Sequence, residues 1–127
     1  MKITKFTELE FIPASHEDPS NPGALKKVLL KRDDLPAGRI QMINWAKIPK
    51  GKTFKPHYHE KMIEVFIIMN GRVRATIDSE EEILEKGDMV IAFEGQIHTF
   101  ENLSDEDVEY FAMGIVTSDG GKSVNKD

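Results

Sequence analysis

Four side chains of this sequence have the types and the spacing of a metal site. His57 and His59 are two residues apart, Glu64 follows five residues later, and His98 lies further along the chain. Imidazole nitrogens and a carboxylate oxygen form a mixed donor set that suits a divalent transition metal such as manganese, iron, nickel, zinc, cobalt or copper. The sequence therefore predicts one divalent ion, bound by these four residues.

The spacing also indicates how the chain must bring these residues together. On a strand, residues two apart share a face, so His57 and His59 can point to one side while Tyr58 points away. Glu64 is an odd number of residues from His59 and cannot share that face on one unbroken strand. We therefore expect a turn at about residues 60–62, which carries the chain into the next strand before Glu64.

The predicted donor set leaves an ion incompletely coordinated. Three neutral imidazoles and one carboxylate leave a divalent ion with about one unit of positive charge and about two open positions of an octahedral shell. Such a centre attracts water or a small, oxygen-rich anion. Because a structural ion is normally enclosed by protein, this favours catalysis by oxygenation, isomerisation or decarboxylation, with Glu64 as a candidate general base.

The elements that must position these residues are short strands. Runs of β-branched and aromatic residues, broken by turn signals, dominate from Lys26 onward and predict an all-β fold. We expect strands near residues 26–31, 39–48, 53–59, 63–70, 72–77, 80–85, 88–93, 97–102 and 107–117. The first of these segments is also compatible with a short helical turn.

The pair Asn70-Gly71 is the strongest local turn signal. A two-residue hairpin turn needs positive φ at both central positions, which Asn and Gly adopt most readily. We therefore expect the strands at 63–69 and 72–77 to form a hairpin. The first of them (IEVFIIM) is apolar on both faces apart from Glu64, which indicates that protein covers both faces.

Glycines flank the candidate ligands at regular intervals. Gly51 precedes His57 by six positions and Gly71 follows Glu64 by seven, while a second block contains Gly87, Gly95, His98 and Asn102. These blocks resemble the two signature motifs of the cupin family. Every named position of the first motif is matched, and the second departs only where Phe93 replaces the usual proline, which affects a turn and not a ligand. The resemblance covers about residues 39–117.

The resemblance implies a small single-domain cupin of the conserved-barrel type, with a double-stranded β-helix, or jelly roll. It also implies that the four candidate ligands bind a metal. Cupins include enzymes as well as non-catalytic proteins that bind sugars or other small molecules, so the resemblance leaves both functions open. A metal-stabilised structural protein is a third, less favoured reading. Many cupins are dimers, and apolar segments outside the motifs predict a homodimer here.

Further residues of the site are predicted from strand parity. Gln96 and Asn102 share a face with His98 and are candidates to hydrogen-bond a ligand residue and orient it. Phe66, Ile68, Phe93 and Phe100 are candidates for an apolar wall, although plain core packing is the favoured interpretation of each residue taken alone. His16 lies in a loop beside Glu17 without a second histidine, so we expect no part for it in metal binding.

Length and composition indicate how many domains the chain forms and which cysteine-dependent sites it lacks. The chain has 127 residues, one domain's worth, which we divide into an N-terminal arm and loop (1–25), the barrel (26–117) and a flexible tail (118–127). Without cysteine it has neither disulfides nor thiolate metal sites, and we expect a cytoplasmic protein.

Charge and hydropathy argue against nucleic acid and membranes as partners, which leaves small molecules. With 17 Lys and Arg against 22 Asp and Glu, the net charge of −5 argues against nucleic-acid binding, and no apolar run approaches the length of a membrane span. The lysines at 47, 50, 52 and 55 and the acidic stretch at 78–85 are interpreted as solvated strand surfaces.

Overall fold

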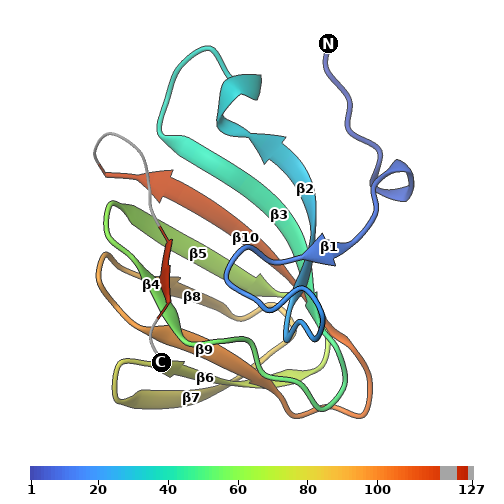
Figure 1. Cartoon of the computed structure of the whole chain (residues 1–127), viewed down its shortest axis with the longest axis vertical. Helices are drawn as coiled ribbons and strands as arrows, with labels where there is room; N and C mark the ends of the chain where they lie inside the picture. Colours follow the sequence, from blue (N-terminus) through green and yellow to red (C-terminus); the bar gives the residue numbers. More distant parts are fainter. Residues whose placement is uncertain (118–122, 126–127) are drawn as a thin grey trace.

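The computed structural model describes residues 1–117 and 123–125, and the side chains of residues 1–117. The chain forms short strands joined by turns, with two single-turn 3-10 helices (Figure 1). In order, the elements are η1 (Phe6–Glu8), β1 (Ile12–Pro13), β2 (Leu25–Lys31), η2 (Arg32–Asp34), β3 (Ile40–Ile48), β4 (His57–His59), β5 (Met62–Ile68), β6 (Arg72–Ile77), β7 (Glu80–Glu85), β8 (Met89–Ala92), β9 (His98–Asn102), β10 (Val108–Val116) and β11 (Ser123–Asn125).

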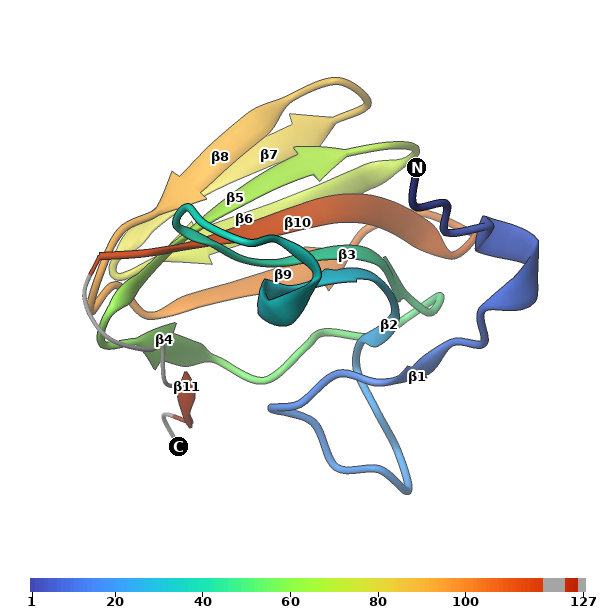
Figure 2. The ribbon, with the colours of Figure 1, turned by 90° about the horizontal axis from the view of Figure 1, so that it is seen from above.

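These strands form two antiparallel sheets. The first sheet has six strands in the order β1-β2-β3-β10-β5-β8, and the second has five in the order β11-β4-β9-β6-β7. Strands adjacent in the sequence repeatedly fall into different sheets, so the chain winds back and forth between the two layers (Figure 2). The predicted all-β jelly-roll barrel is confirmed.

The strand predictions agree closely with the structure. Eight of the nine predicted strands match an observed strand to within two residues at each end. The exception is the segment 53–59, of which only β4 is a strand. Residues 49–56 form only isolated hydrogen-bonded contacts with β9 among the described residues, such as the β-bridge between Thr53 and Glu101. Pro56 has no N–H and therefore cannot continue the hydrogen-bond ladder. The segment 25–31 is a strand between β1 and β3.

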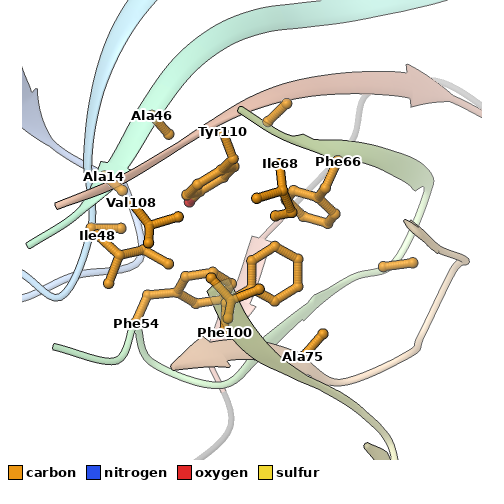
Figure 3. Close-up of a cluster of buried hydrophobic side chains, with 14 residues drawn as sticks. Ala14, Ala46, Ile48, Phe54, Phe66, Ile68, Ala75, Phe100, Val108 and Tyr110 are labelled. Atoms are coloured by element: carbon orange, nitrogen blue, oxygen red, sulfur yellow. The ribbon is translucent and has the colours of Figure 1, made fainter. Parts of the chain in front are cut away.

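The inner faces of the sheets form the core. Along β10 buried residues alternate with partly exposed ones over the whole strand, which is the pattern of a strand with one face in the barrel. Figure 3 shows the largest of the core side chains, Phe54, Phe66, Phe100, Ile68 and Tyr110, facing one another between the sheets. Phe100 is 0% exposed and Ile68 is 1% exposed. This apolar cluster fixes the separation of the two layers.

The predicted hairpin at Asn70-Gly71 is wrong. β5 pairs with β10 and β8, whereas β6 pairs with β7 and β9 in the other sheet. Only Gly71 has a positive φ, of 70°. The side chain of Asn70 accepts a hydrogen bond from the N–H of Glu109 (2.7 Å) and donates one to the carbonyl of Asp107 (2.9 Å). These long-range bonds make the pair a corner between the two sheets, which local turn preference could not indicate.

The tightest hairpin joins β6 to β7 instead. Ile77 pairs with Glu80 across Asp78 and Ser79, and Asp78 has a φ of 53°. β7 lies at the edge of its sheet, and five of its six residues are exposed. The predicted solvated acidic hairpin is therefore confirmed.

Both ends of the chain add a short strand that the sequence did not predict. In the N-terminal arm, β1 pairs with β2. Within the segment predicted as a flexible tail, β11 pairs with β4, and residues 118–122 and 126–127 lie outside the described residues. In the part of the chain that the structure describes, no helix has the length and apolar character needed to cross a membrane.

We predict that Gly71→Ala destabilises the fold by about 2 to 4 kcal/mol. A Cβ at this position would lie 2.6 Å from Oγ of Ser104 and 2.8 Å from Cγ2 of Val108, in addition to the strain of a positive φ. Gly51→Ala is the matched control, because its φ is 75° and no atom lies within 4 Å of the added Cβ, so it should lose only about 1 to 2 kcal/mol. Urea unfolding measures both, and equal losses would contradict the close packing of the corner.

Candidate metal centre

Both sheets contribute to the candidate metal site. His57 and His59 lie on β4 and His98 lies on β9, whereas Glu64 comes from β5 in the opposite sheet. His57 and His98 are directly paired in register, so their side chains share the inner face. The donor atoms of all four residues lie within 4.8 Å of one another. The four residues that the sequence selects are therefore brought together.

The crossing between the sheets occurs at the predicted turn. Glu60 and Lys61 separate β4 from β5, as the odd spacing between His59 and Glu64 requires. Main-chain bonds hold both sides of this turn, because the N–H of Gly95 donates to the carbonyl of His59 and the N–H of Thr117 donates to that of Lys61, each at 2.9 Å.

Backbone carbonyls orient two of the histidine rings. Nδ1 of His57 lies 2.8 Å from the carbonyl oxygen of Lys55, and Nδ1 of His98 lies 3.1 Å from that of Gln96. Because a carbonyl only accepts hydrogen bonds, each Nδ1 must carry the proton. Nε2 of both rings is then left unprotonated, in the form that binds a metal ion.

Glu64 supplies the negative charge of the site. Its Oε1 lies 2.9 Å from Nε2 of His59 and 3.5 Å from Nε2 of His98. Burial acts to raise the pKa of Glu64, but the hydrogen bond from Nε2 of His59 and the proximity of the neighbouring histidine rings outweigh it and hold the pKa well below its usual range. Burial, and then the neighbouring His98, lower the pKa of His57 to about 4. Glu64 is therefore ionised and His57 is neutral at pH 7, which are the protonation states of metal ligands.

These residues fit a divalent metal ion. Among the described residues, Nε2 of His98 and Nδ1 of His59 are buried nitrogens without a hydrogen-bond partner. A buried acceptor without a partner is costly, and an ion between the rings would satisfy Nε2 of His98 together with the carboxylate. The donor set of three imidazoles and one carboxylate suits a transition metal of the types predicted above.

A cavity of about 170 Å³ adjoins the donors, and His57, His59 and Glu64 form part of its wall. The inner face of β3 and β10 forms another part of the wall, where the small side chains of Ala46, paired with Tyr110, and Ala112, paired with Asn44, leave room. Among the described residues, the lining consists of Ala14, Ser15, His16, Lys26, Gln41, Met42, Asn44, Ala46, His57, His59, Met62, Glu64, Tyr110 and Ala112. The donors therefore face a space that can accept a small molecule.

The model of the family described as "Cupin domain" matches residues 44–114, which is more than half of the chain. The chain is a cupin. The matched range includes all four candidate ligands. A comparison with curated proteins finds no match.

Solved structures agree with this family. A predicted oxalate decarboxylase from Thermotoga maritima aligns with a TM-score of 0.79 and 21% identity, over 91% of this chain and 99% of the other. The polyketide cyclase RemF from Streptomyces resistomycificus aligns with a TM-score of 0.76 and 16% identity, over 100% and 86%. A sugar phosphate isomerase of the cupin superfamily from Silicibacter pomeroyi aligns at 0.73 and 18%, over 99% and 82%. At these identities the similarity shows the fold.

The side chains of Gln96 and Asn102 bond other groups in this cupin, and neither of them orients His98. The side chain of Gln96 accepts a hydrogen bond from the N–H of Phe93 and donates one to the carboxylate of Asp78, and only its main-chain carbonyl orients His98. Asn102 lies four residues along β9, about 13 Å from His98. Its amide donates to the carbonyls of Ile48 and Glu106, so it holds a turn and does not orient His98.

Of the four residues predicted to form an apolar wall, three lie in the core near the site and one does not. The ring of Phe66 lies 5.5 Å from that of His98, and Phe100 packs behind it at 4.9 Å, so both support the base of the site within the core. Ile68 is also buried in this cluster. Phe93 is 54% exposed and forms no part of the wall, which corrects the prediction. Since the cupin proline position lies on a surface turn, the side chain there points away from the barrel.

Sequence reasoning missed the proximity of His16 to the metal site. The loop that follows β1 places the ring of His16 on that of His57, with the centroids 3.7 Å apart and the planes 19° apart. Burial, and then the proximity of His57, lower the pKa of His16 to about 3, so this ring is neutral. Its neighbours in sequence are loop residues, and no local signal marks the contact.

Glu17 anchors this loop to the segment that carries His57. The carboxylate is buried, and it accepts hydrogen bonds from the N–H of Gly23 and from the N–H of Lys55, each at 2.7 Å. The carbonyl of the same Lys55 accepts the Nδ1 proton of His57. The sequence carries no local signal for this role, because the burial of Glu17 is decided by the tertiary structure.

We predict that Glu17→Gln destabilises this cupin by about 2 kcal/mol and weakens metal binding by about tenfold. One oxygen of the carboxylate becomes an NH₂ group, which would face a main-chain N–H donor. Glu10→Gln, at an exposed position of the same arm, is the control and should change neither quantity. Urea unfolding and competition with a chromogenic chelator provide the measurements. Unchanged metal affinity in a destabilised Glu17→Gln protein would show that the loop does not position His57.

Proposed function

We propose that this cupin is a metal-dependent enzyme that acts on a compact, oxygen-rich substrate by isomerisation, decarboxylation or oxygenation. One observation carries the proposal: three of the four candidate ligands line an accessible cavity of about 170 Å³, so protein does not enclose the site. A structural ion is normally surrounded by protein ligands, whereas a catalytic ion keeps positions open for water and substrate.

In this proposal His57, His59, Glu64 and His98 would hold one divalent ion of manganese, iron, nickel, zinc, cobalt or copper. When bound, the ion would supply a Lewis acid for a substrate oxygen or lower the pKa of a bound water. Because the pKa of Glu64 is low, its carboxylate is a weak proton acceptor, which favours a role as a metal ligand over a role as a general base.

Two further considerations support a small-molecule substrate. Proteins described as a predicted oxalate decarboxylase and as a sugar phosphate isomerase have the same fold, and both names imply compact, oxygen-rich molecules. The net charge of −5 disfavours nucleic acid. A cytoplasmic location belongs to the same proposal, because a chain without cysteine suits a reducing compartment.

The first test is the metal content. Plasma mass spectrometry of protein reconstituted with a single divalent metal should find about one ion per chain in the wild type and much less in His57→Ala and His98→Ala. His16→Phe is the matched control: it keeps a ring against His57 but changes a histidine outside the donor set, so it should keep the ion. Wild-type protein without metal after reconstitution would refute the proposed function.

The second test separates catalysis from binding alone. The metal-loaded protein is incubated with oxalate, small 2-oxo acids and sugar phosphates and followed by NMR. Turnover of one of these by the wild type, and not by metal-free His98→Ala, supports the enzyme. Glu64→Gln that keeps metal but loses turnover would identify Glu64 as a base. Binding without turnover across all three classes would instead support a non-catalytic sugar-binding or small-molecule-binding module.

We also propose that the protein is a homodimer, joined through the outer face of the six-stranded sheet. On this face three cross-strand pairs of β5 and β10 are apolar and partly exposed: Ile67 with Phe111, Val65 with Met113, and Ile63 with Ile115. Neighbouring pairs extend the surface, because Ile43 of β3 lies opposite Met113 and Ile91 of β8 lies opposite Val65. A contiguous apolar surface of this kind is typical of an interface.

We predict that Val65→Lys, at the centre of this face, converts a dimer into a monomer, because the added charge would be buried without a partner. Ile83→Lys is the control, since Ile83 is a 40% exposed apolar residue on the other sheet. Light scattering at micromolar concentration should give a dimer for the wild type and for Ile83→Lys. A monomeric wild type would rule out the homodimer, and a dimeric Val65→Lys would place the interface elsewhere.

A further inference from the structure

The cavity beside the candidate metal site contains one lysine among its lining residues, Lys26 of β2. Lys26 pairs in register with Ala46, which pairs in turn with Tyr110, so the three residues form one row across the inner face of the sheet. Its Nζ donates a hydrogen bond to Oγ of Ser15 at 2.8 Å. The fold therefore places a cation in the same space as the four donors.

Among the described residues, no carboxylate lies within ion-pair distance of this cation. Lys26 forms no ion pair with any residue in the described part of the chain, although the protein has an excess of acidic side chains. Burial lowers its pKa, and the charge of Glu64 only partly opposes this. An ammonium group that has lost part of its hydration without gaining an anion is a costly arrangement in a protein, which a bound anion would relieve.

A second polar group of the cavity also lacks a partner. Asn44 is 8% exposed, and its Oδ1 is buried without a hydrogen bond among the described residues. Asn44 pairs with Val28 of β2, and this pair lies two residues along the strands from the pair of Lys26 and Ala46, so Asn44 is on the same face of the sheet. The cavity wall therefore offers a charged donor and a free amide oxygen on the side opposite His57 and His59.

Lys26 also stands where the cavity meets a second hollow. This outer hollow, of about 410 Å³, shares Lys26, Gln41, Met42 and Asn44 with the cavity, and Lys31 and Arg32 also line it. Lys26 therefore borders both spaces, and the outer one also contains the carboxylate of Asp33. The position is therefore suited to selecting a ligand by charge.

We propose that Lys26 is a specificity-determining residue, which binds the second carboxylate of a compact dicarboxylate whose first carboxylate occupies the metal site. This inference rests on the proposed function, because it requires an ion at His57, His59, Glu64 and His98. The charges agree with it: a divalent ion and one glutamate leave one positive charge, and Lys26 adds another, so the cavity matches a dianion. Asn44 is available to a hydroxyl group or a water between the two ends.

The test compares dicarboxylates with a monocarboxylate. Calorimetric titration of the zinc-loaded protein with malonate, succinate and glutarate should find at least one of them that binds more tightly than acetate. Lys26→Met should weaken that dicarboxylate by about tenfold to a hundredfold, because it removes a charge-assisted hydrogen bond, and should change acetate binding by less than about threefold. Lys50→Met, at an exposed position outside both hollows, should leave all four affinities unchanged.

Metal content is measured on every sample, which separates the two proposals. If the wild type carries no zinc, the proposed function fails. If zinc is present in both proteins but Lys26→Met binds the dicarboxylate as the wild type does, or if no dicarboxylate exceeds acetate, the role of Lys26 is refuted and the metal site stands. Lys26→Gln provides a second variant should Lys26→Met fail to fold, and Lys26→Arg should restore part of the affinity.

Discussion

The buried carboxylate of Glu64 is the constraint on which the rest of the site depends. Removing a carboxylate from water costs several kcal/mol unless charges and hydrogen bonds compensate it. Here the compensation comes from the hydrogen bond of His59, which belongs to the opposite sheet. The two layers must therefore meet at a fixed distance, and the aromatic cluster of Phe66 and Phe100 beside the site sets that distance.

The loop between β1 and β2 also fixes the position of His57. Glu17 ties this loop to Lys55, whose carbonyl orients His57, and His16 stacks on the same ring. Hydrogen bonds from outside the barrel thus fix the orientation of the His57 ring, which the strand alone would leave adjustable. The same loop supplies Ser15, the partner of Lys26, so one segment shapes both the donor side and the cation side of the cavity.

Local pattern predicted most of the strands and the donor set, since strand periodicity and ligand spacing are encoded over a few residues. It failed where distant segments decide the outcome. Asn70-Gly71 has the composition of a hairpin turn, yet the bonds from Asn70 to Asp107 and Glu109 make it a corner between the sheets. Parity placed Asn102 on the face of His98 but could not show that the backbone of Ile48 and Glu106 would engage its amide.

The sequence by itself therefore determined the all-β class, most of the strand positions and the four candidate ligands, because strands follow from residue types at short, regular spacing and the ligands lie within two recognisable motifs. Only the tertiary structure decided which strands pair, that His16 and Lys26 lie at the cavity, and that Asn44 and Ala112 leave it open. These are contacts between segments far apart in the chain. Their free energy comes from burial and pairing in the assembled barrel, which no local stretch of sequence contains.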